Sequence, residues 1–345
     1  MISGSRDGRR GAGKLAVCFP LLLTLLPALS PARDVDLELA EESRVSMACT
    51  FSIAAYHPDR RKAAIALDEA FTEIDRIDRL MSHYNARSPL SELNRKASSG
   101  PVAVDPELFH FIEECVRYSR ESDGAFDITV GPLMKAWGFF RGEGKLPDSA
   151  SLRSALRRVG YKHLAIDPAE QTIQFERPGM ELDLGGIAKG YAVDRAIDLL
   201  RKRGIASALV SAGGSTVYAL GNPPESEGWE VSIRDPLDRN RNAETVLLKN
   251  RALSISGSSE KFFRRNGVTY GHVMDPRTGR PVQNILSVAV LARTGTAGDA
   301  LDNVFYVLGP KKSRNYLNRL SETEVIFFLP AQHRRWKAIR LQSPG

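Results

Sequence analysis

The chain has 345 residues, of which 42% are hydrophobic and 26% are charged, and this balance excludes an extended disordered chain. Its formal net charge of +7 does not indicate a nucleic-acid partner. The first 33 residues hold five basic residues and one acidic residue, and the excess of about +3 on the rest of the chain forms no basic run.

Residues 1–32 have the order of a secretory signal peptide: a basic head, an apolar stretch from Leu15 to Leu29, and small residues behind it. The apolar stretch is too short to cross a membrane comfortably as a helix. We therefore expect export to the periplasm, with an uncleaved inner-membrane anchor as the alternative. Residues 33–44 are polar and acidic, and we expect them to form a linker.

Behind the linker, the hydrophobic pattern predicts a strand and then a helix. Apolar residues alternate from Val45 to Ala54, as in a strand with one buried face. From Arg60 to Met81 they recur every three or four residues, as on the buried face of a helix. Further helices are expected after the N-cap pair Asp105-Pro106, from Gly190 to Arg203 and from Ala300 to Val307.

Short strands fill much of the rest. They are expected in a hairpin from Gly160 to Phe175, around Gly213-Gly214 between Ala206 and Leu220, and at Trp229–Ile233, Thr245–Leu248, Ala252–Ile255, Ser287–Leu291 and Val325–Leu329. Because helices and strands interleave without strict alternation, the sequence favours an α+β fold. We expect one domain over residues 45–335 and a C-terminal tail over residues 336–345.

A glycine-rich segment from Asp183 to Gly190 leads into the third predicted helix. Such an entry directs backbone N–H groups, and here Lys189, toward an anion. The spacing matches neither the Rossmann fingerprint nor the P-loop. Taken alone, the segment is best interpreted as a glycine turn before a helix.

A second cluster, from His272 to Gly279, contains an Asp-Pro turn that closes on glycine. In isolation it is a tight surface turn, but it gathers a histidine, an arginine and a threonine. Asp299 and Asn303 form a third cluster, four residues apart on a predicted helix. That spacing puts both side chains on one helix face, where their oxygens suit a hard cation, although acids in a first helical turn are common in any protein.

These clusters belong to an ordered series. Its earlier members are Met47-x-x-Thr50, Met81-Ser82-x-Tyr84, Ser91–Asn94, Ser122–Leu133 and Trp137-Gly138-Phe139. Its later members are LDLGGIAKGYAVD from Leu182, SAGGS from Ser211, IRDP from Ile233, SISGSSE from Ser254, HVMDPRTG from His272 and AGDALDN from Ala297. From about Met47 to Leu329 the chain closely resembles the ApbE family of FAD:protein FMN transferases.

The resemblance implies an ApbE-like, T-fold-related α+β domain of two lobes, with mixed or antiparallel sheets and flanking helices, and with FAD in the cleft. The family's FAD-binding positions fall on Met47, Tyr84, Ala125, Phe126, Asp127, Asp183, Lys189 and Val273. Its Mg²⁺ ligands fall on the carbonyl of Gly186 and on the side chains of Asp299 and Asn303. The chain departs from the family pattern at Asn303, often threonine, and at Ser215, usually aspartate.

The activity implied is Mg²⁺-dependent transfer of FMN from FAD to a threonine or serine hydroxyl of an exported or membrane-bound redox flavoprotein, with release of AMP. We nominate His272 as the base and Asp299 as a catalytic cation ligand, and a structural histidine is the alternative for His272. Lys189 or Arg277 would add positive charge, and Tyr84 and Phe126 suit stacking on a ring. An FAD pyrophosphatase and a non-catalytic FAD-binding protein remain the alternative functions.

Overall fold

The computed structural model describes residues 36–142, 144–257 and 261–344. The predicted leader at residues 1–32 lies outside the described residues. From Leu37 to the C-terminus the chain forms a single unit of contacts. In the described part of the chain, no helix combines the length and the apolar character needed to cross a membrane.

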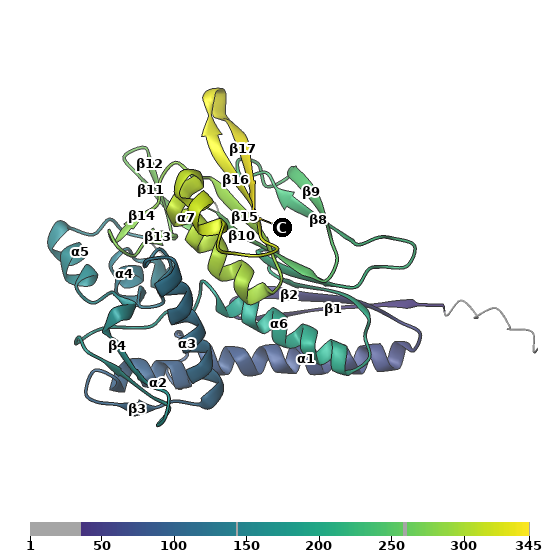
Figure 1. Cartoon of the computed structure of the whole chain (residues 1–345), viewed down its shortest axis with the longest axis horizontal. Helices are drawn as coiled ribbons and strands as arrows, with labels where there is room; N and C mark the ends of the chain where they lie inside the picture. Colours follow the sequence, from purple (N-terminus) through teal and green to yellow (C-terminus); the bar gives the residue numbers. More distant parts are fainter. Residues whose placement is uncertain (1–35, 143, 258–260, 345) are drawn as a thin grey trace, which may run out of the picture. The chain divides into compact units, whose positions relative to one another are not determined.

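An eight-stranded sheet forms the centre of the unit, in the order β1-β2-β6-β7-β10-β15-β16-β17 (Figure 1). Each pair of neighbours in it is antiparallel. The strands are β1 (Glu38–Ser46), β2 (Cys49–His57), β6 (Ser207–Ala212), β7 (Thr216–Leu220), β10 (Arg251–Gly257), β15 (Ser287–Ala292), β16 (Glu324–Ala331) and β17 (Arg335–Gln342). Together with the helices, this sheet confirms the predicted α+β class.

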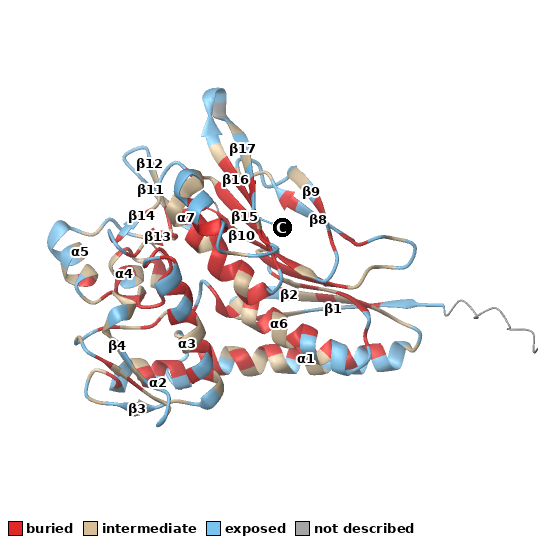
Figure 2. Cartoon of the chain, in the orientation of Figure 1, coloured by how far each residue is buried: buried red, intermediate tan, exposed pale blue. Residues whose placement is uncertain are grey.

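Three helices pack on the sheet: α1 (Arg60–Met81), α6 (Ala188–Lys202) and α7 (Gly295–Leu317), and α6 contacts both of the others. Their inner faces and the central strands hold most of the buried residues (Figure 2). A second apolar cluster lies between the sheet and the hairpin of β8 (Trp229–Arg234) and β9 (Asn242–Leu248). Because the central strands have apolar neighbours on both faces, β7 and β15 are buried along their whole length and show no alternation.

The remaining helices and strands have the following bounds. The helices are α2 (Pro89–Lys96), α3 (Pro106–Glu121), α4 (Gly131–Ala136) and α5 (Ser149–Leu156), with 3-10 turns η1 (Phe139–Arg141), η2 (Tyr161–His163) and η3 (Gln332–Arg334). The strands are β3 (Val102–Ala103), β4 (Leu164–Asp167), β5 (Thr172–Phe175), β11 (Phe262–Arg265), β12 (Val268–Gly271), β13 (Met274–Asp275) and β14 (Arg280–Pro281). Within the described residues, β11–β12 and β13–β14 form separate two-stranded sheets.

The structure corrects two predicted boundaries. Residues 38–44, expected as part of a linker, belong to β1, which pairs with β2 from Glu38 opposite His57 to Ser46 opposite Cys49. Residues 336–342, expected in a tail, belong to β17 and pair with β16. Both are the outermost strands of the sheet, where side chains are largely exposed, so backbone pairing holds polar sequences that lack a hydrophobic pattern.

The strand expected from Val45 to Ala54 is in fact a hairpin that reverses at Met47 and Ala48. Both residues have positive φ, 49° and 58°, in the left-handed region that strains residues with a Cβ. We expect Ala48→Gly to raise the free energy of unfolding by about 1 kcal/mol, because glycine adopts this conformation without that cost. Urea unfolding of both proteins measures the difference.

The matched control is Ala54→Gly, which places the same change inside β2, away from the turn. There the loss of a strand residue with a Cβ should lower the free energy of unfolding by about 0.5–1 kcal/mol. Equal destabilisation by the two substitutions would show that the turn at Ala48 carries no relievable strain.

Candidate functional site

A cavity in the described structure has a volume of about 980 Å³. All the residues that the sequence nominated as FAD-binding, catalytic or cation-binding line this one cavity, although they come from segments far apart in the chain. They are Met47, Tyr84, Ala125, Phe126, Asp127, Asp183, Gly186, Lys189, His272, Val273, Asp299 and Asn303. The structure thus brings the nominated positions together, while their individual roles stay predictions.

The N-termini of α6 and α7 meet at the floor of this cavity. A Cβ added to Gly190 would lie 2.1 Å from the carbonyl oxygen of Gly295, so only glycine permits the close approach of the two helices. Asp194 of α6 accepts hydrogen bonds from the backbone N–H of Gly295 at 2.6 Å and of Thr296 at 2.8 Å. These contacts fix the first turn of α7, which carries Asp299 and Asn303.

Asp299 is buried, with 4% of its surface exposed. Its Oδ2 accepts from the backbone N–H of Gly190 at 2.7 Å, and its Oδ1 accepts from the hydroxyl of Thr216. Burial raises the pKa of this carboxyl group, and Lys189 acts in the opposite direction. Each carboxylate oxygen keeps a second lone pair, so a role as cation ligand is open to Asp299, but its hydrogen bonds also give it a structural role.

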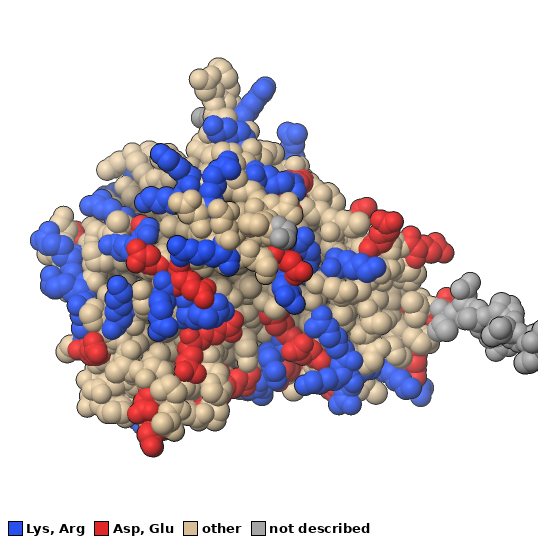
Figure 3. All heavy atoms as spheres, in the orientation of Figure 1, with Lys and Arg blue, Asp and Glu red and all other residues tan. Residues whose placement is uncertain are grey.

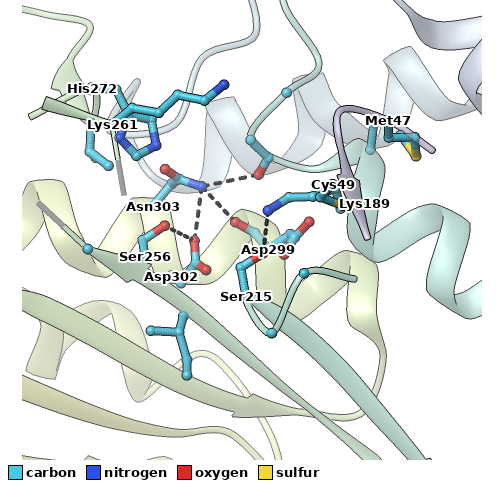
Figure 4. Close-up of a pocket in the computed structure, with 18 of the residues that line it drawn as sticks. Met47, Cys49, Lys189, Ser215, Ser256, Lys261, His272, Asp299, Asp302 and Asn303 are labelled. Carbon is cyan, nitrogen blue, oxygen red and sulfur yellow. Dashed lines mark hydrogen bonds between the residues drawn. The ribbon is translucent and has the colours of Figure 1, made fainter. Parts of the chain in front are cut away.

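The amide of Asn303 marks the point where oxygen atoms converge (Figure 4). Its Nδ2 lies 3.1 Å from the carbonyl oxygen of Gly186, 2.9 Å from that of Asp299 and 2.9 Å from Oδ1 of Asp302. An amide nitrogen carries two hydrogens, so three acceptors exceed what it can serve. A point surrounded by carbonyl and carboxylate oxygens fits a hard cation such as Mg²⁺.

Asp302, next to Asn303 in the chain, adds a second carboxylate to this site. Its side chain is buried, and its Oδ1 also accepts from the hydroxyl of Ser256 at 2.9 Å. Within the described residues no group of three His, Cys, Asp or Glu side chains is placed to hold a metal. The oxygen set found here consists instead of the backbone carbonyls of Gly186 and Asp299 and one carboxylate oxygen of Asp302.

Lys189 projects from the first turn of α6, and its Nζ donates to the hydroxyl of Ser215 (Figure 4). That hydroxyl in turn donates to the carbonyl of Ala212 at 3.1 Å. A neutral partner therefore stands where the family pattern has a carboxylate.

His272 has a buried Nδ1 that makes no hydrogen bond in the described structure. Its backbone N–H donates to the carbonyl of Lys261 at 3.0 Å, and among the described residues no carboxylate forms an ion pair with the ring. Burial lowers the pKa of His272 to about 4, and the positive charges of Lys261 and Lys189 act in the same direction. The ring is thus neutral at ordinary pH and has a nitrogen able to accept a proton.

The Asp-Pro turn behind His272 is closed by its own residues. Arg277 contacts both carboxylate oxygens of Asp275, at 2.8 and 2.9 Å, and the backbone N–H groups of Thr278 and Gly279 donate to the carbonyl of Asp275. Arg277 does not line the cavity. Our expectation that Arg277 adds charge to the site is therefore not supported, because its guanidinium already has a carboxylate partner.

The two rings expected to stack differ in exposure. Phe126 is 6% exposed and packs edge-on against Tyr118, so it forms the cavity wall from within the core. Tyr84 is 52% exposed, and its ring lies 3.9 Å from that of His83 and 5.2 Å from that of Phe140, between centroids. Only Tyr84 of the two thus offers an open ring face, supported from behind by two further rings.

Asp127 is held by hydrogen bonds within the protein. One of its oxygens accepts from the backbone N–H and the hydroxyl of Thr129, at 2.8 and 2.7 Å, and the other accepts from the backbone N–H of Tyr161 at 2.8 Å. Its burial raises the pKa of the carboxyl group, while these hydrogen bonds lower it. Asp127 therefore holds the cavity wall in shape, whatever it contributes to a ligand.

Sequence reasoning missed several residues of the cavity. His83 lies 3.3 Å from Asp183, between its Nδ1 and the carboxylate Oδ1, and Lys261 lies beside His272 in Figure 4. A histidine next to Tyr84 in the series was a signal that we left unused, whereas nothing in the sequence brings Lys261 to His272. The cavity also reaches β8 and the segment after it, at Arg234 and Arg239.

Comparison with known proteins gives consistent results. The model of the ApbE family matches residues 47–327. The FAD:protein FMN transferase of Treponema pallidum (strain Nichols) is 33% identical over 288 residues, which cover 79% of this chain and 79% of that protein. The FAD:protein FMN transferase of Escherichia coli (strain K12) is 32% identical over 267 residues, 76% of each chain.

Solved structures agree in fold. The ApbE protein of Thermotoga maritima superposes with a TM-score of 0.78 at 28% identity, covering 86% of this chain and 97% of that one. The flavin transferase ApbE from Vibrio cholerae gives a TM-score of 0.78 at 28% identity, covering 88% of this chain and 97% of that one. These structures confirm the expected ApbE-like fold.

Proposed function

Because the chain belongs to the ApbE family, we propose that it is an FAD:protein FMN transferase, like the relatives that carry this name. The observation that supports the proposal most directly is the cavity of about 980 Å³, which gathers every position expected to bind FAD or a cation. The proposed reaction moves FMN from FAD to a threonine or serine hydroxyl of an acceptor protein and releases AMP.

The bond changes of this reaction balance without a further reactant. The acceptor oxygen forms a bond to the phosphorus of the FMN half, and the bond from that phosphorus to the oxygen of AMP breaks. The hydroxyl proton passes to a base, for which we propose the unpartnered Nδ1 of His272. A neutral imidazole is required for this step, and the lowered pKa of His272 supplies it.

The site also needs positive charge, because the departing AMP carries a phosphate. We propose that the carbonyl oxygen of Gly186 and a carboxylate oxygen of Asp302 would hold Mg²⁺ together with the amide oxygen of Asn303, once that amide is reversed from the orientation seen here, with Asp299 next to them. Bound there, the cation supplies charge that neutralises the diphosphate. Lys189 stands in the same cavity and adds a second positive charge. The ring face of Tyr84 suits a planar ring of FAD.

The pH dependence of transfer is a direct consequence of the pKa of His272. A base must be unprotonated to act, and a pKa of about 4 leaves His272 neutral at every pH above that value. We therefore expect no loss of kcat/KM from this histidine as the pH falls from about 8 to about 5, and a loss only near pH 4. Initial rates of AMP release over this range measure it.

Circular dichroism at each pH separates inhibition from unfolding. A one-proton loss of activity with a midpoint near pH 6.5, where an unperturbed histidine titrates, would contradict this account if it disappears in His272→Gln.

The test of the function uses the purified protein with FAD, Mg²⁺ and a candidate acceptor. Transfer makes the acceptor fluorescent under ultraviolet light in a denaturing gel, in step with the release of AMP. Release of AMP and FMN without labelling of any acceptor would identify an FAD pyrophosphatase instead. FAD that stays intact during long incubation would leave only the binding protein.

We also propose that the protein acts after export, on an acceptor redox protein that is exported or bound to the inner membrane. The order of residues 1–32 supports this location. Fractionation of cells that express the full chain tests it, because a periplasmic or membrane-bound protein and a cytoplasmic one separate in that experiment. Recovery in the cytoplasm alone would contradict the proposal.

A further inference from the structure

A second, smaller cavity of about 450 Å³ lies against the end of α5. Three arginines dominate its lining, which consists of Ser154, Arg157, Arg158, Arg177 and Pro178. None of these residues lines the large cavity, so the proposed FMN transfer makes no use of them.

Two of the three guanidinium groups are held in place by backbone carbonyls. Arg158 donates through Nε to the carbonyl of Ser154 at 3.1 Å, and Arg177 donates through Nη1 to the carbonyl of Arg157 at 2.9 Å. Each guanidinium carries five N–H donors, so both retain donors for a further partner. Their position is therefore fixed before any ligand arrives.

The turn beneath Arg158 is shaped to receive it. Gly179 has a φ of 76°, in the left-handed region, and a Cβ added there would lie 2.9 Å from Cδ of Arg158. The aliphatic part of the Arg158 side chain thus lies directly over Gly179. Any other residue at position 179 would displace that side chain. Arg158 and Arg177 are both half-buried, in contrast to the exposed Arg157.

The positive charges here have no acidic partner. Among the described residues, no carboxylate lies within 4.0 Å of the guanidinium nitrogens of these three arginines. The carboxylate of Glu176, which precedes Arg177, instead contacts His163, with 3.4 Å between Oε2 and Nδ1. Lys and Arg side chains also gather over α5, at the left edge of Figure 3. Like charges held around one cavity repel one another unless an anion is bound between them.

We propose that this three-arginine cavity is a binding site for a phosphate group, separate from the FAD site. The planar fork of arginine matches the oxygens of phosphate in pairs, and charge-assisted hydrogen bonds of this kind are the strong ones. The phosphate is either free in solution or the headgroup of an anionic lipid, and the chemistry of the site is the same for both.

The test is a titration of the protein with inorganic phosphate at constant ionic strength, followed by NMR of its arginine Nε–Hε signals. We expect saturable shifts that are weakened at least about tenfold by Arg158→Gln or by Arg177→Gln. Arg60→Gln, which removes an exposed arginine at the start of α1, is the matched control and should leave the shifts unchanged. Unaltered FAD-dependent activity in all three variants would keep the two sites distinct.

Shifts that do not saturate, or that chloride reproduces at the same ionic strength, would overturn the proposal. Undiminished phosphate binding in both cavity variants would do so as well. Sedimentation with phosphatidylglycerol vesicles, against phosphatidylcholine vesicles, then identifies the source. Binding to the former that free phosphate displaces indicates a lipid headgroup, and saturable binding of free phosphate without vesicle binding indicates the free anion.

Discussion

Replacing Asp299 by alanine is expected to lower the rate of FMN transfer by at least about 100-fold, because the diphosphate loses cation-derived charge stabilisation worth several kcal/mol. The structure adds a second consequence. The carboxylate of Asp299 accepts from the backbone N–H of Gly190 and from the hydroxyl of Thr216 inside the core. Alanine leaves these donors unpaired, and we expect the free energy of unfolding to fall by about 2 kcal/mol.

The two effects are separated by Thr216→Val, which removes one hydrogen bond to Asp299 and keeps the carboxylate. Transfer is measured as acceptor fluorescence, and stability as urea unfolding, for both variants. We expect Thr216→Val to lose stability by about 1 kcal/mol with far less loss of activity than Asp299→Ala. If activity falls in proportion to stability in the two variants, Asp299 is a structural residue and not part of the cation site.

His272→Gln is expected to lower kcat by about 100-fold to 10,000-fold, the contribution typical of a general base. Glutamine keeps a polar side chain of similar length but cannot accept the proton at neutral pH. Since the ring has no carboxylate partner in the described structure, its removal breaks no ion pair, and the KM for FAD should change little. Steady-state rates of AMP release with and without acceptor measure both constants.

The control for this variant is His110→Gln, an exposed histidine of α3 that contacts Glu113. It should retain full activity. A His272→Gln enzyme that keeps its kcat would remove the histidine from the mechanism, and one that loses FAD binding with kcat unchanged would make it a binding residue instead.

The sequence predicted the helices of this fold better than the outermost strands of its sheet. Helix α1 spans Arg60–Met81, as its three-to-four-residue spacing indicated, because one face is buried along its whole length. The outer strand β1 was missed because its side chains are mostly exposed and largely polar, and what holds it is backbone pairing with β2. Hydrophobic patterns report burial, and an edge strand has little of it.

The nominated residues of the site were found because the resemblance supplies an ordered set of motifs, and the structure gathers them around one cavity. Their exact contacts were beyond the sequence. The spacing of Asp299 and Asn303 put both on one helix face, but it could not show that the carboxylate of Asp299 caps α6. Likewise, the pairing of Arg277 with Asp275 follows from the path of the turn and not from the residue types.

The most direct test of the account is a crystal structure with FAD bound and Mn²⁺ in place of Mg²⁺, in which anomalous scattering locates the cation. We expect one peak that contacts the carbonyl oxygen of Gly186, an oxygen of Asp302, Asn303 or Asp299, and an oxygen of the diphosphate, at about 2.0–2.3 Å each. A diphosphate bound away from these oxygens, or a cation that contacts none of them, would contradict the proposed site.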